Sequence, residues 1–312
     1  MRQIAVIVNP RSAGGRTARR WGRLRAALED RLGAVEVRLT ETPGHAIELA
    51  RELVRGGFTL IVGVGGDGTY NEIANGLLLD DQPLNSEAKL GILPLGTGGD
   101  FQRTLGIPSR PEQAVELLAR GRTIEIDVGK LVCRTPDGGA ARRYFVNLVS
   151  FGMGGEVAAR SRNFLSPLGG KTAFFYATVQ VFPFYRSKTV ELALDDGRPR
   201  GYRVLNVAIG NGRYHGGGMH VCPRAALDDG LLEVTVIEDL SLFTLLKDLS
   251  YLYDGRIYAH PKVRHFHATR LQASSPEITR IEVDGEPLGT LPIEITILPK
   301  RLKVLVPEAI VE

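Results

Sequence analysis

A glycine-rich turn that carries one carboxylate and one hydroxyl is the stretch of this sequence best suited to chemistry. The run Gly65-Gly66-Asp67-Gly68-Thr69 follows an apolar, β-branched segment at residues 58–64, and apolar residues recur at helical spacing after it. It therefore lies on a strand-to-helix turn, where unpaired backbone N–H groups and the helix dipole favour a phosphate. Glycine lets the main chain approach such a ligand, and Asp67 could hold Mg²⁺ or a nucleotide hydroxyl. A tight connection without a ligand is the other reading.

Two further glycine-bearing turns follow predicted strands. Residues 9–15 (Asn-Pro-Arg-Ser-Ala-Gly-Gly) come after an apolar segment at 2–8, and residues 94–101 (Pro-Leu-Gly-Thr-Gly-Gly-Asp-Phe) end a fourth predicted strand. In a parallel α/β sheet, ligands bind at the edge formed by the carboxyl ends of the strands. We therefore expect a nucleotide to touch more than one of these turns. None of them is a Walker A loop or has the dinucleotide fingerprint's spacing.

Carboxylates recur on two turns late in the chain. Val283-Asp284-Gly285-Glu286 offers two of them on one turn, where a carboxylate could accept a proton. The same residues equally suit a β-hairpin turn. Asp228-Asp229-Gly230 carries two more and is also simply a good turn sequence.

In their order along the chain, these motifs resemble the soluble diacylglycerol kinase catalytic-domain family. Six segments carry the resemblance over nearly the whole chain: 9–14, 65–72, 94–101, 126–130, 228–232 and 283–286. NAD kinases and phosphofructokinases share the central Gly-Gly-Asp-Gly-Thr motif. One position departs from the family pattern, since Gly99 stands where the family usually has Asn. The usual role of that position is therefore not assigned.

The resemblance implies an enzyme that uses ATP and Mg²⁺ to phosphorylate a lipid hydroxyl at the bilayer surface, with diacylglycerol as the leading candidate. It implies Glu286 as general base, Asp284 as the alternative, and Asp67 near the metal. The implied ATP-site residues are Asn9, Pro10, Arg11, Ser12, Ala13, Thr40, Gly65, Gly66, Asp67, Gly68, Thr69, Tyr70, Asn71, Glu72 and Thr97. The implied metal residues are Asp127, which would help to organise magnesium, and Ala226, Asp229 and Leu231 at a structural magnesium site.

Other activities stay open on the sequence. Ceramide, a sphingoid base or a phosphatidylglycerol-type headgroup would each present a hydroxyl beside acyl chains. An NAD kinase would share the central motif and phosphorylate a soluble dinucleotide. A nucleotide- or lipid-binding regulator without catalysis is a further alternative, for which Gly99 is the one sign.

The elements that would position these residues form two domains. Residues 1–129 alternate strand-like segments with helices at 17–31 and 45–55, which predicts a Rossmann-like parallel α/β domain similar to that of NAD kinases and phosphofructokinases. Residues 130–312 predict an all-β, sandwich-like domain, whose last strand could return to the first domain. Few helices are expected there, with candidates at 171–182 and 242–253. The predicted strands are 144–149, 189–194, 204–210, 231–237, 263–271, 280–283 and 293–298. By the resemblance, function lies in the cleft between the domains.

Composition narrows the class of protein. The 312 residues carry a net charge of +4, too small to indicate a nucleic-acid partner. The two cysteines are far apart and belong to no Cys-x-x-Cys pair, which argues against a disulfide framework or zinc site. The sequence has no signal-peptide pattern and no apolar stretch long enough to span a bilayer, so we expect a cytoplasmic protein.

Four features lie outside the motif set. Arginines between residues 11 and 25 could meet an anionic membrane, which would make lipid contact peripheral, or could be an ordinary solvated face. The aromatic stretch 174–185 could border an acyl-chain groove or pack on the β-domain. His265 and His267 are taken as structural or solvent-facing, and the role of the loop 211–218 is open. Exposed strand edges would make a homodimer reasonable.

Overall fold

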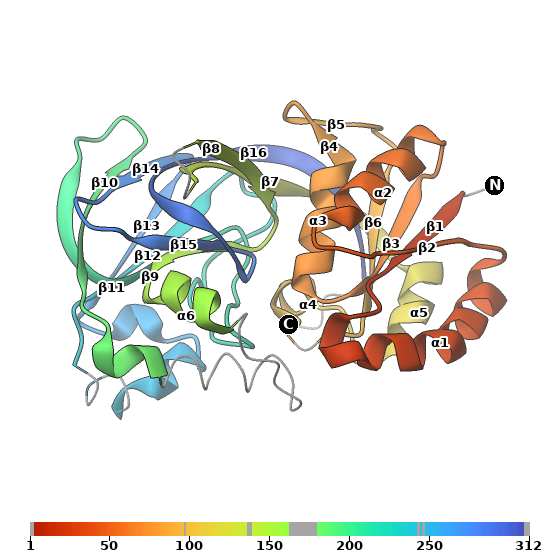
Figure 1. The fold of residues 1–312 in the computed structure, drawn as a ribbon, viewed down its shortest axis with the longest axis horizontal. Coiled ribbons are helices and arrows are strands. Elements are labelled where there is room, and N and C mark those ends of the chain that lie inside the picture. Colours follow the sequence, from red (N-terminus) through yellow and green to blue (C-terminus); the bar gives the residue numbers. More distant parts are fainter. Residues whose placement is uncertain are drawn as a thin grey trace. The chain divides into compact units, whose positions relative to one another are not determined.

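The computed structural model describes residues 3–96, 98–135, 139–161, 180–241, 244 and 247–308. The chain divides into two compact units (Figure 1). The first consists of Met1–Asp127 together with Pro299–Glu312, and the second is Val128–Leu298. The sequence alone places the boundary at residue 129, and the structure assigns the last strand segment to the first unit.

The first unit is a parallel sheet with helices on both faces (Figure 1). The strands run in the order β6 (Lys89–Pro94), β3 (Leu60–Gly65), β1 (Ile4–Val8) and β2 (Glu36–Leu39), and the end of β16 (Glu286–Val306) pairs in parallel with β6. Helices α1 (Arg16–Leu32) and α5 (Pro111–Arg120) pack together on one face, and α2 (His45–Arg55) and α3 (Asp67–Leu77) on the other. Smaller elements are a 3-10 turn (Ser12–Gly15), α4 (Asp100–Thr104) and the strand pair β4 (Leu78–Leu79) and β5 (Gln82–Pro83).

Continuous apolar runs account for the central strands of this sheet. Every residue of β1 and β3 is buried, as expected for parallel strands that are covered by helices on both faces. The chain moves from β1 to β2 in one direction and from β3 to β6 in the other. Such a reversal opens a crevice at the carboxyl ends of the two strands where it occurs, which is the usual ligand site of an open α/β sheet.

The second unit is built mainly from antiparallel strands. These are the end of β7 (Arg122–Arg134), β8 (Ala140–Phe145), β9 (Leu148–Gly152), β10 (Lys188–Leu194), β11 (Arg200–Gly210), β12 (Leu232–Glu238), β13 (Val263–Ala268), β14 (Arg270–Ser274), β15 (Arg280–Val283) and the start of β16. Its described helices are α6 (Met153–Ser161) and the 3-10 helices η2 (Phe182–Phe184), η3 (Leu249–Leu252) and η4 (Ile257–Ala259). The pairings β10-β11-β9-β15-β16-β14 return to β10 and close a ring around an apolar core that contains Phe145 and Phe151. The predicted fold class, an α/β domain followed by an all-β sandwich-like domain, is confirmed.

Three predicted elements differ from the structure, two of them because side chains compete for backbone groups. The predicted strand 144–149 is broken between β8 and β9, where backbone N–H groups donate to Asp284 instead of to a neighbouring strand. The predicted strand 263–271 is two strands, because the N–H of Thr269 donates to Asp195. The described part of the predicted helix 242–253 ends in the 3-10 helix η3. Of the predicted helix 171–182, residues 171–179 are not among the described residues. Among the described helices, none is long and apolar enough to cross a membrane.

Candidate active site

The turns after β1, β3 and β6 are hydrogen-bonded to one another at the carboxyl edge of the first unit's sheet. Asn9 N donates to Val64 O at 2.9 Å, and Asn9 Nδ2 donates to Thr69 Oγ1 at 3.2 Å. Leu95 N and Gly96 N both donate to Gly65 O, at 3.0 and 2.6 Å. The three glycine-bearing turns singled out in the sequence therefore meet, and they do so at the reversal point between β1 and β3.

Part of the glycine requirement at these turns comes from packing. A Cβ atom at position 96 would overlap Gly66 Cα and lie 2.8 Å from Gly66 N. A Cβ atom at position 65 would overlap the side chain of Thr69. Glycine is needed here so that two backbone turns can touch, which also leaves the main chain open to a ligand above them.

The first turn is held by local hydrogen bonds and is accessible. Ser12 Oγ donates to Asn9 O at 3.0 Å, and Arg11 N donates to Asn9 Oδ1 at 3.0 Å. Asn9, Pro10, Ser12 and Ala13 are partly exposed and Arg11 is exposed. Thr40, at the end of β2, donates its N–H to Val8 O and is 8% exposed. The turn thus presents preformed polar groups beside the central motif.

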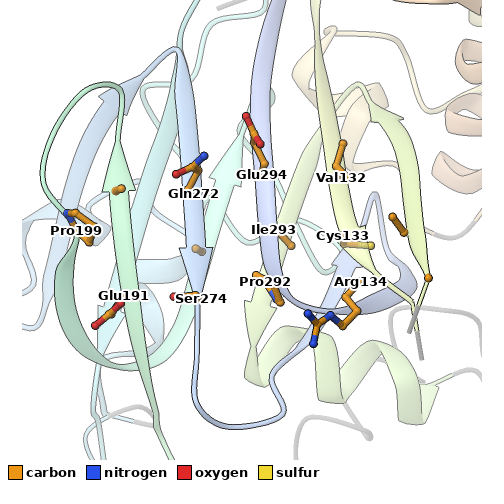
Figure 2. A pocket seen from close by; sticks show the side chains of 14 residues that line it. Val132, Cys133, Arg134, Glu191, Pro199, Gln272, Ser274, Pro292, Ile293 and Glu294 are labelled. Atoms are coloured by element: carbon orange, nitrogen blue, oxygen red, sulfur yellow. The ribbon is translucent and has the colours of Figure 1, made fainter. Parts of the chain in front are cut away.

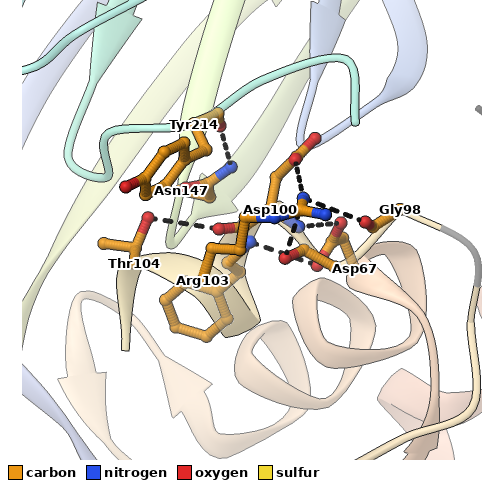
Figure 3. Close-up of polar contacts among 9 residues, drawn as sticks. Asp67, Gly98, Asp100, Arg103, Thr104, Asn147 and Tyr214 are labelled. Carbon is orange, nitrogen blue, oxygen red and sulfur yellow. Dashed lines mark hydrogen bonds and ion pairs between the residues drawn. The ribbon is translucent and has the colours of Figure 1, made fainter. Parts of the chain in front are cut away.

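Asp67, in the turn after β3, is hydrogen-bonded to the turn after β6. Its Oδ2 accepts a hydrogen bond from Asp100 N at 3.0 Å and its Oδ1 one from Phe101 N at 3.3 Å (Figure 3). Arg103 Nη1 in turn donates to Asp100 Oδ1 at 2.9 Å and to Gly98 O at 3.3 Å. Asp67 therefore holds the start of α4 in place, and a metal ion at Asp67 would share oxygens that already accept hydrogen bonds.

Three predicted ATP-site residues are used by the fold. Tyr70 is 1% exposed, and its hydroxyl donates to Gly65 O at 2.8 Å; burial, with a smaller contribution from Asp67, raises its pKa well above the usual value. Glu72 accepts from Gly44 N at 2.8 Å and from Ala46 N at 3.2 Å, so its carboxylate fixes the start of α2. Asn71 is 2% exposed and accepts a hydrogen bond from Asn75 Nδ2. Thr97 lies outside the described residues.

The hairpin between β15 and β16 separates the two candidate bases. Val283 pairs with Glu286, and Asp284 and Gly285 form the turn with φ of +48° and +86°. The Asp284 carboxylate is 6% exposed and accepts hydrogen bonds from Val146 N (3.0 Å), Asn147 N (3.1 Å) and Leu148 N (2.7 Å). Glu286 is exposed. Asp284 is thus committed to holding a loop, and the geometry favours Glu286 as the group that could take a proton from a substrate.

The predicted metal residues lie in two separate parts of the chain. Asp127 is fully buried and accepts from Lys300 N at 2.8 Å, which ties β7 to β16 in the first unit. Asp229 is exposed and accepts from Leu231 N at 3.0 Å, on the same loop of the second unit as Ala226. This loop offers one carboxylate and main-chain carbonyls, the oxygen donors that Mg²⁺ takes. Among the described residues, no group of three or more His, Cys, Asp or Glu side chains is placed to hold a metal ion.

Comparisons with known proteins place this chain in a family. The model of the diacylglycerol kinase catalytic domain matches residues 3–131, and that of the YegS C-terminal NAD kinase beta sandwich-like domain matches residues 147–306. The chain belongs to the diacylglycerol kinase catalytic-domain family of lipid kinases. A Serratia proteamaculans protein named "Probable lipid kinase YegS-like" is 30% identical over 97% of this chain and 93% of its own. A Staphylococcus aureus diacylglycerol kinase is 28% identical over 99% and 94% of the two chains.

A solved structure shares the fold over the same length. It is titled as a diacylglycerol kinase from Bacillus anthracis, matches with a TM-score of 0.72 at 23% identity, and the match covers 99% of this chain and 98% of that one. At this identity the likeness concerns the fold alone.

The backbone conformation at position 99 explains why Gly can stand there in place of the Asn that the family usually has. Gly99 has a φ of +73°, in the left-handed region. Asn is the side chain that adopts this region most readily after Gly, so either residue can hold the turn before Asp100. The departure therefore preserves the backbone of the turn while removing the amide group.

The loop 211–218, whose role the sequence left open, is held by hydrogen bonds. Asn211 N and Gly212 N donate to Asn147 O at 2.9 and 2.7 Å, and Asn147 Nδ2 donates to Tyr214 O at 3.0 Å (Figure 3). His215, within this segment, lies 3.0 Å from buried Glu282. Sequence reasoning missed Glu282 and His215; the only available signal was a charged residue between two apolar ones in β15.

A groove of about 670 Å³ lies on the strands of the second unit (Figure 2), and no predicted site residue lines it. Its lining combines the polar side chains of Arg134, Glu191, Gln272 and Glu294 with apolar ones such as Val132, Pro292 and Ile293. Of the aromatic stretch 174–185, residues up to 179 lie outside the described part of the chain.

Proposed function

We propose that this lipid kinase transfers the γ-phosphoryl group of ATP to a hydroxyl of diacylglycerol, giving phosphatidic acid and ADP. The observation that supports it most is the meeting of three glycine-bearing turns at the reversal point of the first unit's sheet, in a chain of this family. Relatives of nearly equal length that are named diacylglycerol kinase support the choice of acceptor.

The first unit supplies the nucleotide site in this proposal. Backbone N–H groups at residues 66–68 bind the ATP phosphates, with the turn 9–13, Thr40 and Thr97 lining the rest of the site. Asp67 keeps the turns together through the N–H groups of Asp100 and Phe101. Mg²⁺, when bound, neutralises charge on the phosphates. Asp67 and Asp127 are the carboxylates proposed near it, and Ala226, Asp229 and Leu231 are proposed to hold a separate, structural ion.

Glu286 is the proposed general base. It accepts the proton of the lipid hydroxyl as that oxygen forms a bond to the γ-phosphorus and the bond from the γ-phosphorus to the β–γ bridging oxygen breaks. Asp284 takes no proton in this scheme, because three backbone N–H groups occupy its carboxylate. Its part is to fix the turn on which Glu286 lies.

Contact with the membrane is proposed to be peripheral, through α1. Arg16, Arg19, Arg20 and Arg23 are all exposed on this helix. Each basic side chain near an anionic surface contributes about 1 kcal/mol of binding free energy. Replacing all four by Gln should weaken sedimentation with vesicles that contain phosphatidylglycerol, and unchanged sedimentation would remove α1 from the proposal.

The assay is transfer of labelled γ-phosphate from ATP in mixed micelles. Diacylglycerol, ceramide, sphingosine and phosphatidylglycerol are offered separately, and NAD is offered without lipid. Label in phosphatidic acid supports the proposal, and label in another lipid corrects the acceptor. Label in NAD alone would favour a second candidate function, that of an NAD kinase. The match of the second domain to an NAD kinase beta sandwich-like domain is the observation that supports this candidate. ATP binding without any transfer would favour a regulator.

The role of Glu286 has its own test. Glu286→Gln should lower kcat about 10²- to 10⁴-fold, the usual contribution of a general base. Glu294→Gln is the matched control, because Glu294 is an exposed carboxylate on the same strand. Full activity of the Glu286 variant would show that another group takes the proton.

A further inference from the structure

A buried glutamate, histidine and serine lie beside the hairpin that carries Glu286. Glu282 is fully buried, and its Oε1 accepts a hydrogen bond from Ser150 Oγ at 2.7 Å and lies 3.0 Å from His215 Nε2. Its Oε2 has no hydrogen bond from any residue that the structure describes. A carboxylate taken out of water is costly unless it is partnered, so Glu282 depends on Ser150 and His215.

Strand alternation places Glu282 on the side of β15 away from the apolar core. Its neighbours Ile281 and Val283 belong to that core, and side chains alternate along a strand, so Glu282 points to the opposite side. There it faces Ser150, its pairing partner on β9. The bulge in this part of the sheet lies on β16, where the register shifts opposite Ile281 and Glu282.

Glu282 and Asp284 each bind a loop, and the two loops are hydrogen-bonded to each other. Asp284 holds the N–H groups of residues 146–148, and Glu282 contacts His215 at the start of the 215–219 turn. His215 and Met219 exchange two backbone hydrogen bonds, at 2.8 and 2.9 Å, which close that turn. Asn147 joins the two loops through Asn211, Gly212 and Tyr214. His215 is therefore connected to the Asp284–Gly285 turn in two ways: through Glu282 on β15, and through Asn147 and the N–H groups that Asp284 accepts.

We propose that His215 and Glu282 form a positioning pair for phosphoryl transfer. The pair fixes the β15–β16 hairpin and, through it, the carboxylate of Glu286, so it acts on the reaction without touching the substrate. This inference rests on the proposed role of Glu286. It predicts that disrupting this pair lowers kcat, whereas disrupting another histidine–glutamate pair in the second unit does not.

The chain contains such a pair for comparison. Glu233 on β12 is 1% exposed, and its Oε2 lies 2.6 Å from Nε2 of His267 on β13. β13 pairs with β12 on the far side of β11 and β9 from β15, so this pair has no part in holding the hairpin. His267→Phe thus removes a histidine from a buried glutamate without disturbing the hairpin.

Steady-state kinetics of four variants test the pair. His215→Phe and Glu282→Gln should lower kcat about tenfold to a hundredfold with the KM for ATP unchanged, since small misplacements of a reacting group have effects of this size. His215→Gln keeps a donor near Glu282 and should stay within about threefold of the parent. His267→Phe should keep its kcat. Unchanged kcat in a folded Glu282→Gln protein would overturn the proposal even if His215→Phe failed to fold.

Non-additivity separates positioning from general damage. If His215 acts through Glu286, adding His215→Phe to Glu286→Gln should lower kcat no further, because the group being positioned is already lost. A further tenfold loss in the double variant would show that His215 acts elsewhere.

Amide hydrogen exchange gives a readout that needs no activity. In His215→Phe, the amides of residues 146–148, which donate to Asp284, should exchange at least tenfold faster, while His267→Phe leaves them protected. Should the parent protein phosphorylate no lipid, the proposed function fails while this measurement still decides whether the pair holds the hairpin. Equal protection in all variants would exclude the pair.

Discussion

The carboxylate of Asp67 accepts a hydrogen bond from the backbone N–H of Asp100, 33 residues further along the chain. This bond joins the turn after β3 to the start of α4, and the next N–H, that of Phe101, donates to the second oxygen of the same carboxylate. Asp67 thus shapes the proposed nucleotide site through the fold itself, independently of any metal ion. Arg103 completes the arrangement by binding the Asp100 side chain from the following helical turn.

Asp67→Asn should therefore impair both structure and activity. The amide keeps one oxygen acceptor, so we expect a loss of about 1–2 kcal/mol in the free energy of unfolding and at least a tenfold fall in kcat/KM for ATP. Asp195→Asn is a matched control, because Asp195 also accepts backbone N–H bonds, from Thr269 and Arg270, on an exposed turn of the second unit. An Asp67 variant as active as the Asp195 variant would contradict this role.

Position 99 should tolerate Asn better than Ala. Both residues place a Cβ near Gln102 Oε1, but the left-handed φ of +73° is accessible to Asn and costs Ala about 1–2 kcal/mol. The melting temperature of Gly99→Asn should therefore lie above that of Gly99→Ala. Equal melting temperatures would mean that the turn relaxes. Kinase assays of the Asn variant would then show whether the family's amide adds activity.

Gly96→Ala should damage the nucleotide site through the backbone. Its Cβ would overlap Gly66, and neither backbone segment can move without breaking the bonds of Leu95 and Gly96 to Gly65 O. We expect ATP binding, measured by calorimetry, to weaken at least tenfold. Gly22→Ala in α1 is the control, since a Cβ there meets no atom within 4 Å and alanine favours the helix.

Alkaline pH should destabilise the protein partly through Cys222. Burial raises the pKa of this thiol from the usual 9.0 to about 12, so the folded protein keeps it protonated where the unfolded chain ionises. The stability that this provides is complete below pH 9 and is lost as the pH rises from 9 towards 12, at about 1.4 kcal/mol per pH unit. In urea unfolding, Cys222→Ala should show a shallower decline above pH 9. Parallel curves for the two proteins would refute the assignment.

Local sequence signals predicted much of the fold and the nucleotide turns. The strands β1 and β3 and the helix α2 were evident from apolar runs and helical spacing, because the residues that form them are neighbours in sequence. The glycine turns carried their own signature for the same reason. The predicted binding, metal and catalytic roles of individual residues stay predictions.

Long-range contacts of polar side chains could not be predicted in this way. Asp284 binds backbone groups 136 to 138 residues earlier in the chain, and Glu72 binds the start of α2, 26 to 28 residues before it. A carboxylate in a sequence does not indicate whether it faces solvent or backbone N–H groups, because the partner segment has no periodic signal. The break in the predicted strand 144–149 has the same origin.

The strand β16 has a consequence for how the protein is made. Its residues 303 and 304 pair with β6, so the first unit includes a strand that follows the whole second unit in the chain. A domain whose residues come first in the chain ordinarily folds while later residues are still being synthesised. Here the sheet of the first unit cannot be completed until the second unit has been synthesised, so premature termination anywhere in the second unit leaves β6 without its neighbour and exposed to other chains.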